Sequence, residues 1–76
     1  MSDPIASPQE LGAVIRRERR ALGLRLEDLA LAAGVGMRFL SELERGKATV
    51  QLDRALRVIR TLGLHLELHG TDDEDA

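Results

Sequence analysis

Hydrophobic residues recur at helical spacing in the first part of the chain. One apolar stripe runs along residues 8–22 and consists of Leu11, Val14, Ile15 and Leu22. The segment Ser7-Pro8-Gln9-Glu10, where this stretch begins, has the capping-box pattern with proline at the first helical position. A stripe of this kind behind such a cap predicts a helix from about Pro8 to Leu22, ending at Gly23.

Three further helices are predicted over residues 26–33, 37–45 and 52–62. Gly46 and Gly63 follow the second and third of these, and glycine is the usual residue just past a helix end. The inward side of the last helix is expected to comprise Leu52, Ala55, Leu56, Ile59 and Leu62. Its other side carries three arginines at threefold spacing, expected as a solvated face or, alternatively, as a partner or backbone contact: Arg54, Arg57 and Arg60.

After Gly63 the hydrophobic period changes from 3.6 to 2. The apolar residues Leu64, Leu66 and Leu68 alternate with His65, Glu67 and His69. Such alternation predicts a strand with one buried face over residues 64–69. A single strand cannot satisfy its own backbone groups, so we expect it to pair with the same segment of a second chain across a twofold axis. The predicted fold class is all-α, with four helices and one C-terminal strand pairing across a homodimer.

The second and third predicted helices are separated by a glycine turn within residues 23–46. Ala30 is small enough for two helices to approach closely, and Gly34 can adopt the left-handed conformation that ends the first. Leu40 can anchor the second in the core. This is the layout of a helix-turn-helix, which places its second helix in the DNA major groove. A binding module is therefore favoured over an enzyme.

From about Leu11 to Leu62 the chain resembles the Xre family of phage-type repressors, which implies a lambda-repressor-like domain. The matching positions are Leu29, Ala30, Ala33-Gly34-Val35, Leu40-Ser41-Glu42-Leu43-Glu44 and Gly46-Lys47. Three positions depart from the family. Arg25-Leu26 replaces the usual Thr-Gln, and Gly36 replaces a serine cap, which costs only a few tenths of a kcal/mol. The DNA contact that the family's glutamine makes is in doubt at Leu26.

The whole order of four helices, a Gly-Leu-x-Leu-x-Leu strand and a polar tail, behind Ile5-Ala6-Ser7-Pro8, is similar to HipB-type antitoxins. That resemblance implies a dimeric repressor of its own operon that binds a HipA-type kinase toxin. Two alternatives stay open at this stage. The chain could be a stand-alone repressor without a toxin, or a protein-interaction adaptor that has lost DNA binding, for which Arg25-Leu26 and Gly36 are the only hints.

The geometry of a recognition helix selects the residues that meet DNA. Those predicted to read bases are Met37, Arg38, Ser41 and Glu42. Arg38 is the strongest candidate, because its guanidinium can bond guanine O6 and N7 together. Those predicted to contact the phosphate backbone are Arg25, Gly36, Arg45, Lys47 and Thr49.

By resemblance to Xre domains, Arg19 and Glu44 form a partly buried structural ion pair. We expect Arg16, Arg17 and Arg20 to form a solvated face, with partner binding as the alternative.

Composition limits the other possibilities. The chain has 76 residues, enough for one small domain, and no cysteine. Its net charge is −2, but four of its 13 acids are Asp72, Asp73, Glu74 and Asp75, and without them 11 basic residues face 9 acidic ones.

We expect residues 1–6 to be an N-terminal arm, 7–63 the DNA-binding domain, 64–69 the dimerisation strand and 70–76 a disordered acidic tail. The tail could dock on a toxin, repel non-specific DNA or do neither.

Several function classes are not expected. No nucleophile with a base and no phosphate-cradling glycine loop is present, so neither catalysis nor a cofactor is predicted. His65 and His69 would share a strand face, but without further ligands we predict no metal site. No signal peptide or long apolar run occurs, so we expect a cytoplasmic protein with no membrane partner. The predicted partners are palindromic operator DNA, a second copy and a HipA-type toxin kinase.

Overall fold

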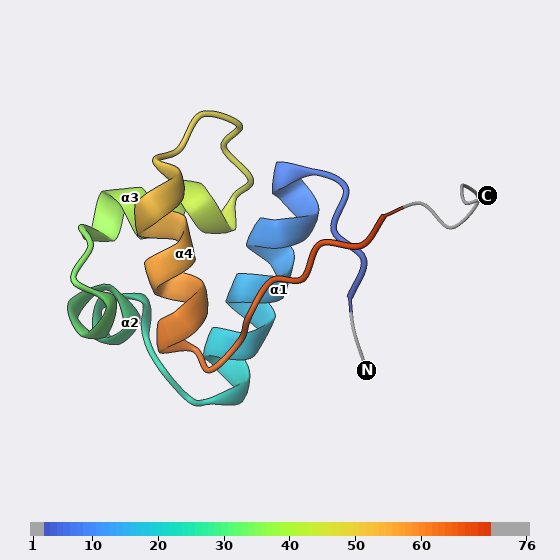
Figure 1. The fold of residues 1–76 in the computed structure, drawn as a ribbon. Coiled ribbons are helices and arrows are strands. Elements are labelled where there is room, and N and C mark those ends of the chain that lie inside the picture. The colour runs from blue at the N-terminus through green and yellow to red at the C-terminus, as the bar shows by residue number, and fades with distance from the viewer. Residues whose placement is uncertain (1–2, 71–76) are drawn as a thin grey trace.

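The computed structural model describes residues 3–70, which contain four helices and no strand. The helices are α1 (Pro8–Ala21), α2 (Leu26–Ala33), α3 (Met37–Glu44) and α4 (Leu52–Thr61) (Figure 1). The all-helical, four-helix prediction is confirmed. Three of the helices end one residue earlier than predicted. In each of them the predicted last residue is a cap residue just outside the helix, and a glycine at positive φ follows it: Gly23, Gly46 and Gly63.

The first helix begins at the predicted cap. The Ser7 hydroxyl accepts a hydrogen bond from the Glu10 backbone N–H at 3.1 Å. The Glu10 carboxylate in turn accepts from the backbone N–H of Ala6, one residue earlier than a standard capping box. The start of α1 is thereby tied to the residues that precede it.

The core lies where α2 packs against α3 and α4, and α1 against α3. Its largest fully buried side chains are Ile15, Leu29, Leu40 and Val58. Two residues predicted to face inward do not. Leu22 is 58% exposed because it follows the last turn of α1, and Leu52 is 67% exposed because it opens α4 beyond the neighbouring helices. Ala55 and Ile59 of α4 are buried as predicted, as is Leu62 just past its end; Leu56 is half-buried, and Val58, absent from the predicted set, is fully buried.

Two glycines let α1 and the end of α3 touch through their backbones. A Cβ on Gly12 would lie 2.5 Å from the carbonyl oxygens of Leu43 and Glu44. A Cβ on Gly46, whose φ is +87°, would lie 2.7 Å from Cα of Gln9. Only glycine fits at either point without moving a helix. This contact sets the distance between α1 and the recognition helix.

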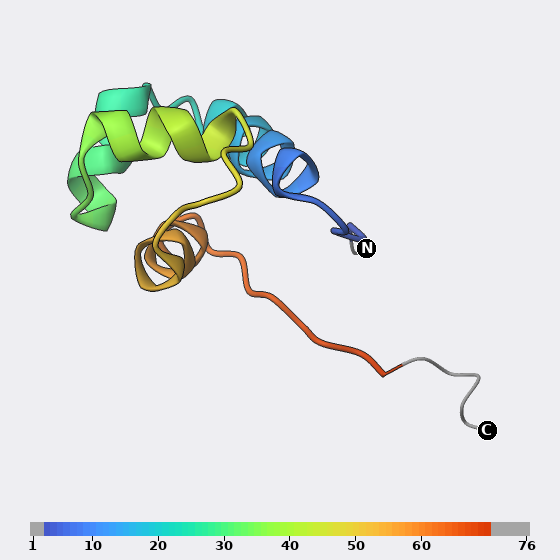
Figure 2. The same ribbon diagram turned by 90° about the horizontal axis from the view of Figure 1, so that it is seen from above.

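The segment predicted as a strand, residues 64–69, is extended but unpaired in the single chain. It leads away from the helices after Gly63 (Figure 2). Leu64 is half-buried against the core, Leu66 is 47% exposed, and Leu68 is fully exposed. A strand needs a neighbour for its backbone hydrogen bonds, so the pairing stays a prediction. The predicted acidic tail, apart from Gly70, lies outside the described residues.

Candidate nucleic-acid interface

A tight glycine turn joins α2 to α3. Gly34 takes the left-handed conformation, with φ +70°, as its role in the turn requires. The N–H groups of Gly34 and Val35 donate to the carbonyls of Leu31 and Ala30, which closes the end of α2. Arg57 of α4 donates to the Gly34 carbonyl at 3.5 Å. The turn is therefore held from both sides, and α3 leaves it at a fixed angle.

One side of α3 is buried and the other is open to solvent. Leu40 and Leu43 lie in the core. The four residues predicted to read bases fall on the opposite side, with Met37 half exposed and the Arg38 side chain 91% exposed. Ser41 and Glu42 follow one turn later and are partly exposed. The helix thus presents a largely polar side to solvent, on which Met37 and Arg38 are exposed and Ser41 and Glu42 are partly covered.

Glu42 contacts two of the basic residues on this face. Its carboxylate lies 3.5 Å from Arg38 Nε and accepts a hydrogen bond from Lys47 Nζ at 3.3 Å. The pKa of Glu42 is below its ordinary value, chiefly because of the Lys47 hydrogen bond. The carboxylate therefore stays ionised and holds both cations close to α3, where DNA would compete with it for them.

The residues predicted to contact the phosphate backbone lie around this face. Gly36 caps α3 with no side-chain hydrogen bond, and a Cβ there would meet nothing within 4 Å. Arg45 ends α3, and the loop after it carries Lys47 and Thr49; all three are exposed. They lie at the C-terminal end of α3, whereas Gly36 lies at its N-terminal end.

The start of α2 is capped without serine or threonine. The backbone N–H of Arg25 donates to Asp28 Oδ2 at 2.8 Å. The Arg25 side chain is largely exposed and its Nε lies 3.8 Å from the same carboxylate oxygen. Asp28 is not among the residues named in the sequence analysis. The acid three residues after the cap position was the signal for this hydrogen bond.

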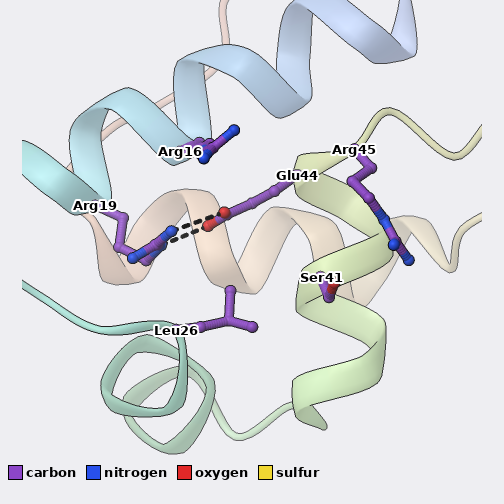
Figure 3. Close-up of a pocket in the computed structure, with 6 residues that line it drawn as sticks. All are labelled: Arg16, Arg19, Leu26, Ser41, Glu44 and Arg45. Atoms are coloured by element: carbon purple, nitrogen blue, oxygen red, sulfur yellow. Dashed lines mark hydrogen bonds and ion pairs between the residues drawn. The ribbon is translucent and has the colours of Figure 1, made fainter.

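Arg19 and Glu44 lie together between α1 and α3 (Figure 3). Arg19 Nε donates to Glu44 Oε2 at 2.7 Å and Nη2 to Oε1 at 3.0 Å, and only 12% and 6% of the two side chains are exposed. Arg19 Nη1 also donates to the Leu24 carbonyl at 2.8 Å. The hydrogen bonds to the Glu44 carboxylate raise the pKa of Arg19. One guanidinium therefore joins α1, the loop before α2 and the recognition helix.

Arg17 is exposed, as expected, and also contacts the N-terminal arm. Its guanidinium donates to both carboxylate oxygens of Asp3, at 3.2 and 2.9 Å, and also bonds Glu18. The hydrogen bond from Arg17 lowers the pKa of Asp3. The two residues are 14 positions apart, and no sequence pattern linked them.

The two histidines contact the glutamate between them. His65 Nε2 and His69 Nε2 lie 3.6 and 3.1 Å from the Glu67 carboxylate oxygens. This places all three on one side of the extended segment, as alternation requires. Across residues 3–70, no group of three or more His, Cys, Asp or Glu side chains could hold a metal ion. None of the helices described there is long and apolar enough to cross a membrane.

Two short helices across a glycine turn, with the second presenting a polar face, define a helix-turn-helix DNA-binding domain. The helix-turn-helix family HTH_3 matches residues 15–69. The HTH-type transcriptional regulator y4mF of Sinorhizobium fredii (strain NBRC 101917 / NGR234), itself uncharacterized, is 41% identical over 68 residues, which is 90% of each chain. The chain belongs to this family and is a helix-turn-helix transcriptional regulator.

Solved structures agree with this fold. A chain of a HipA-HipB-O2-O3 complex superposes with a TM-score of 0.83 over 92% of this chain and 99% of its own, at 23% identity. The clp gene regulator ClgR of C. glutamicum has a TM-score of 0.71 over 87% of this chain and 85% of its own, at 33% identity. The first likeness covers the C-terminal segment as well as the helices, and at that identity it concerns the fold alone.

Proposed function

We propose that this regulator is a dimeric, sequence-specific repressor that binds a palindromic operator upstream of its own gene. The observation that carries the proposal is the solvent-facing side of α3, with Met37, Arg38, Ser41 and Glu42 on one side of a helix anchored by Leu40 and Leu43. Arg38 has the reach and the donors to read guanine. Lys47 and Arg45 supply charge beside it for phosphates.

The dimer is proposed to form through residues 64–69. Exposed leucines at positions 66 and 68 favour burial against a second copy, and the extended backbone leaves hydrogen-bonding groups available. A twofold axis there would relate two α3 helices. Their half-sites should then lie about one turn of DNA, or a multiple of it, apart.

Substitutions in α3 should separate base reading from phosphate contact. Arg38→Ala should cost roughly 1 to 3 kcal/mol on the operator and relax the preference at one base position. Lys47→Ala should weaken operator and random DNA alike and lower the salt slope by about 1. Gel-shift or fluorescence titration of both duplexes measures these effects. An equal loss on both duplexes for Arg38→Ala would make Arg38 a phosphate contact.

We further propose that the operon partner is a HipA-type kinase toxin, with this chain as its antitoxin. Support comes from the HipB structures, which match nearly the full length of this chain, including residues 64–69. The likeness to ClgR, at higher identity, favours a second candidate, a stand-alone regulator. Co-expression with the product of an adjacent kinase-like gene distinguishes them. A stable complex supports the antitoxin, and the absence of such a gene or complex supports the stand-alone regulator.

A further inference from the structure

A depression of about 270 Å³ opens where α1, α2 and α3 meet (Figure 3). The residues that line it are Arg16, Arg19, Leu26, Ser41, Glu44 and Arg45. Ser41 and Arg45 also belong to the exposed side of α3. The depression therefore opens beside the surface proposed to meet the major groove.

Two unpaired arginines give this depression its charge. Arg19 and Glu44 neutralise each other, so the net positive charge comes from Arg16 and Arg45. Neither has a carboxylate oxygen within 4 Å among the residues that the structure describes. By contrast, Arg17, Arg25 and Arg38 each contact at least one acid. Within residues 3–70, Arg16 and Arg45 are thus both exposed and without an acidic partner, as binding of an external anion requires.

The packing of α1 on α3 fixes the place of Arg16. It lies four residues after Gly12, which touches the α3 backbone, and three before Arg19, which bonds Glu44. Residues at these spacings share one helix face. Arg16 consequently projects beside α3 from between two points at which the helices are joined, and its position does not depend on a flexible loop.

We infer that this depression binds a phosphate of the DNA backbone, with Arg16 and Arg45 as its cationic ligands. Two guanidinium groups, one from α1 and one from the end of α3, line the depression together with the Ser41 hydroxyl and suit an anion that offers several acceptor oxygens. The inference rests on the proposed DNA binding and adds Arg16 of α1, a residue outside the recognition helix, to the contact surface. Backbone contacts of this kind fix the orientation of the recognition helix without reading sequence.

The salt dependence of DNA binding tests the inference. Each phosphate neutralised contributes about 0.9 to the slope of log K against log salt. Arg16→Ala should lower the slope by about 0.9 per chain, equally on a duplex from upstream of the gene and on a random duplex. Arg16→Lys should retain the wild-type slope. Arg20→Ala is the matched control, because Arg20 is exposed on the same helix but does not line the depression.

Two results would overturn the inference while leaving DNA binding intact. One is a salt slope for Arg16→Ala equal to that of the wild type, while Lys47→Ala lowers the slope in the same assay. The other is a decrease in salt slope for Arg20→Ala as large as that for Arg16→Ala, which would indicate a diffuse positive field and no defined phosphate site. Titration with inorganic phosphate separates the sources of the anion: phosphate binding that Arg16→Ala abolishes, with no change in the DNA slope, would make this a free-anion site. A wild-type protein that binds neither duplex would instead contradict the proposed function.

Discussion

Glu44→Ala should destabilise the domain by on the order of 3 kcal/mol, because it leaves the Arg19 guanidinium charged and largely buried without its partner. Breaking a buried pair costs about 3 to 5 kcal/mol, and the remaining exposure of Arg19 favours the lower end. Domains of this size have a total stability of only about 5 to 10 kcal/mol. Urea unfolding followed by circular dichroism, at one fixed protein concentration, measures the loss.

Two controls distinguish the charge from general packing. Asp3→Ala removes an exposed carboxylate from Arg17 and should leave the unfolding midpoint close to that of wild type. Arg19→Met combined with Glu44→Leu should recover much of the loss, because an apolar pair of similar volume leaves no unpaired charge. If Glu44→Gln were as stable as wild type, the ion pair would have no large role in the fold.

Leu66→Asp should convert the protein from dimer to monomer. In an antiparallel pairing centred on Leu66, Leu64 faces Leu68 of the second copy and His65 faces Glu67, whereas pairing about Glu67 would oppose two carboxylates. Position 66 would then face its own symmetry mate, and two aspartates there would repel each other directly. Sedimentation equilibrium measures the association constant. Leu31→Asp, at an exposed leucine on α2, is the matched control and should stay dimeric.

The register can be examined separately because the chain has no cysteine. Leu66→Cys should crosslink to its mate under mild oxidation, since directly opposed residues of an antiparallel pair have Cα atoms about 4.5 to 5.5 Å apart. Glu67→Cys should crosslink more slowly. A monomeric wild-type protein, or a helix over residues 64–69, would contradict the proposed dimer.

Local sequence signals predicted most of the fold. The Ser7 cap, the glycines after the helices and the periodic apolar residues located four helices to within about a residue. A stripe gives the side of a helix but not how far its neighbours extend. For that reason the exposure of Leu22 and Leu52 at helix ends was predicted wrongly.

The candidate site was less accessible to sequence reasoning. The exposed side of α3 follows from helical period, and family resemblance placed Arg19 beside Glu44. The contact of Gly12 with the α3 backbone depends on how two helices cross, which no local pattern specifies. The role proposed for Arg16 depends on that crossing. The pairing proposed for residues 64–69 involves a second chain, whose position no pattern within one sequence specifies.

The most direct test of the proposed repressor is the ratio of its affinities for two duplexes of equal length at physiological salt. One carries the DNA immediately upstream of the gene, and the other carries the same bases in shuffled order. Specific repressors bind their operator at least about 10³-fold more tightly than other DNA. We expect a ratio of that order for the wild-type protein. Equal affinity for the two duplexes, or no binding to either, would contradict sequence-specific autorepression.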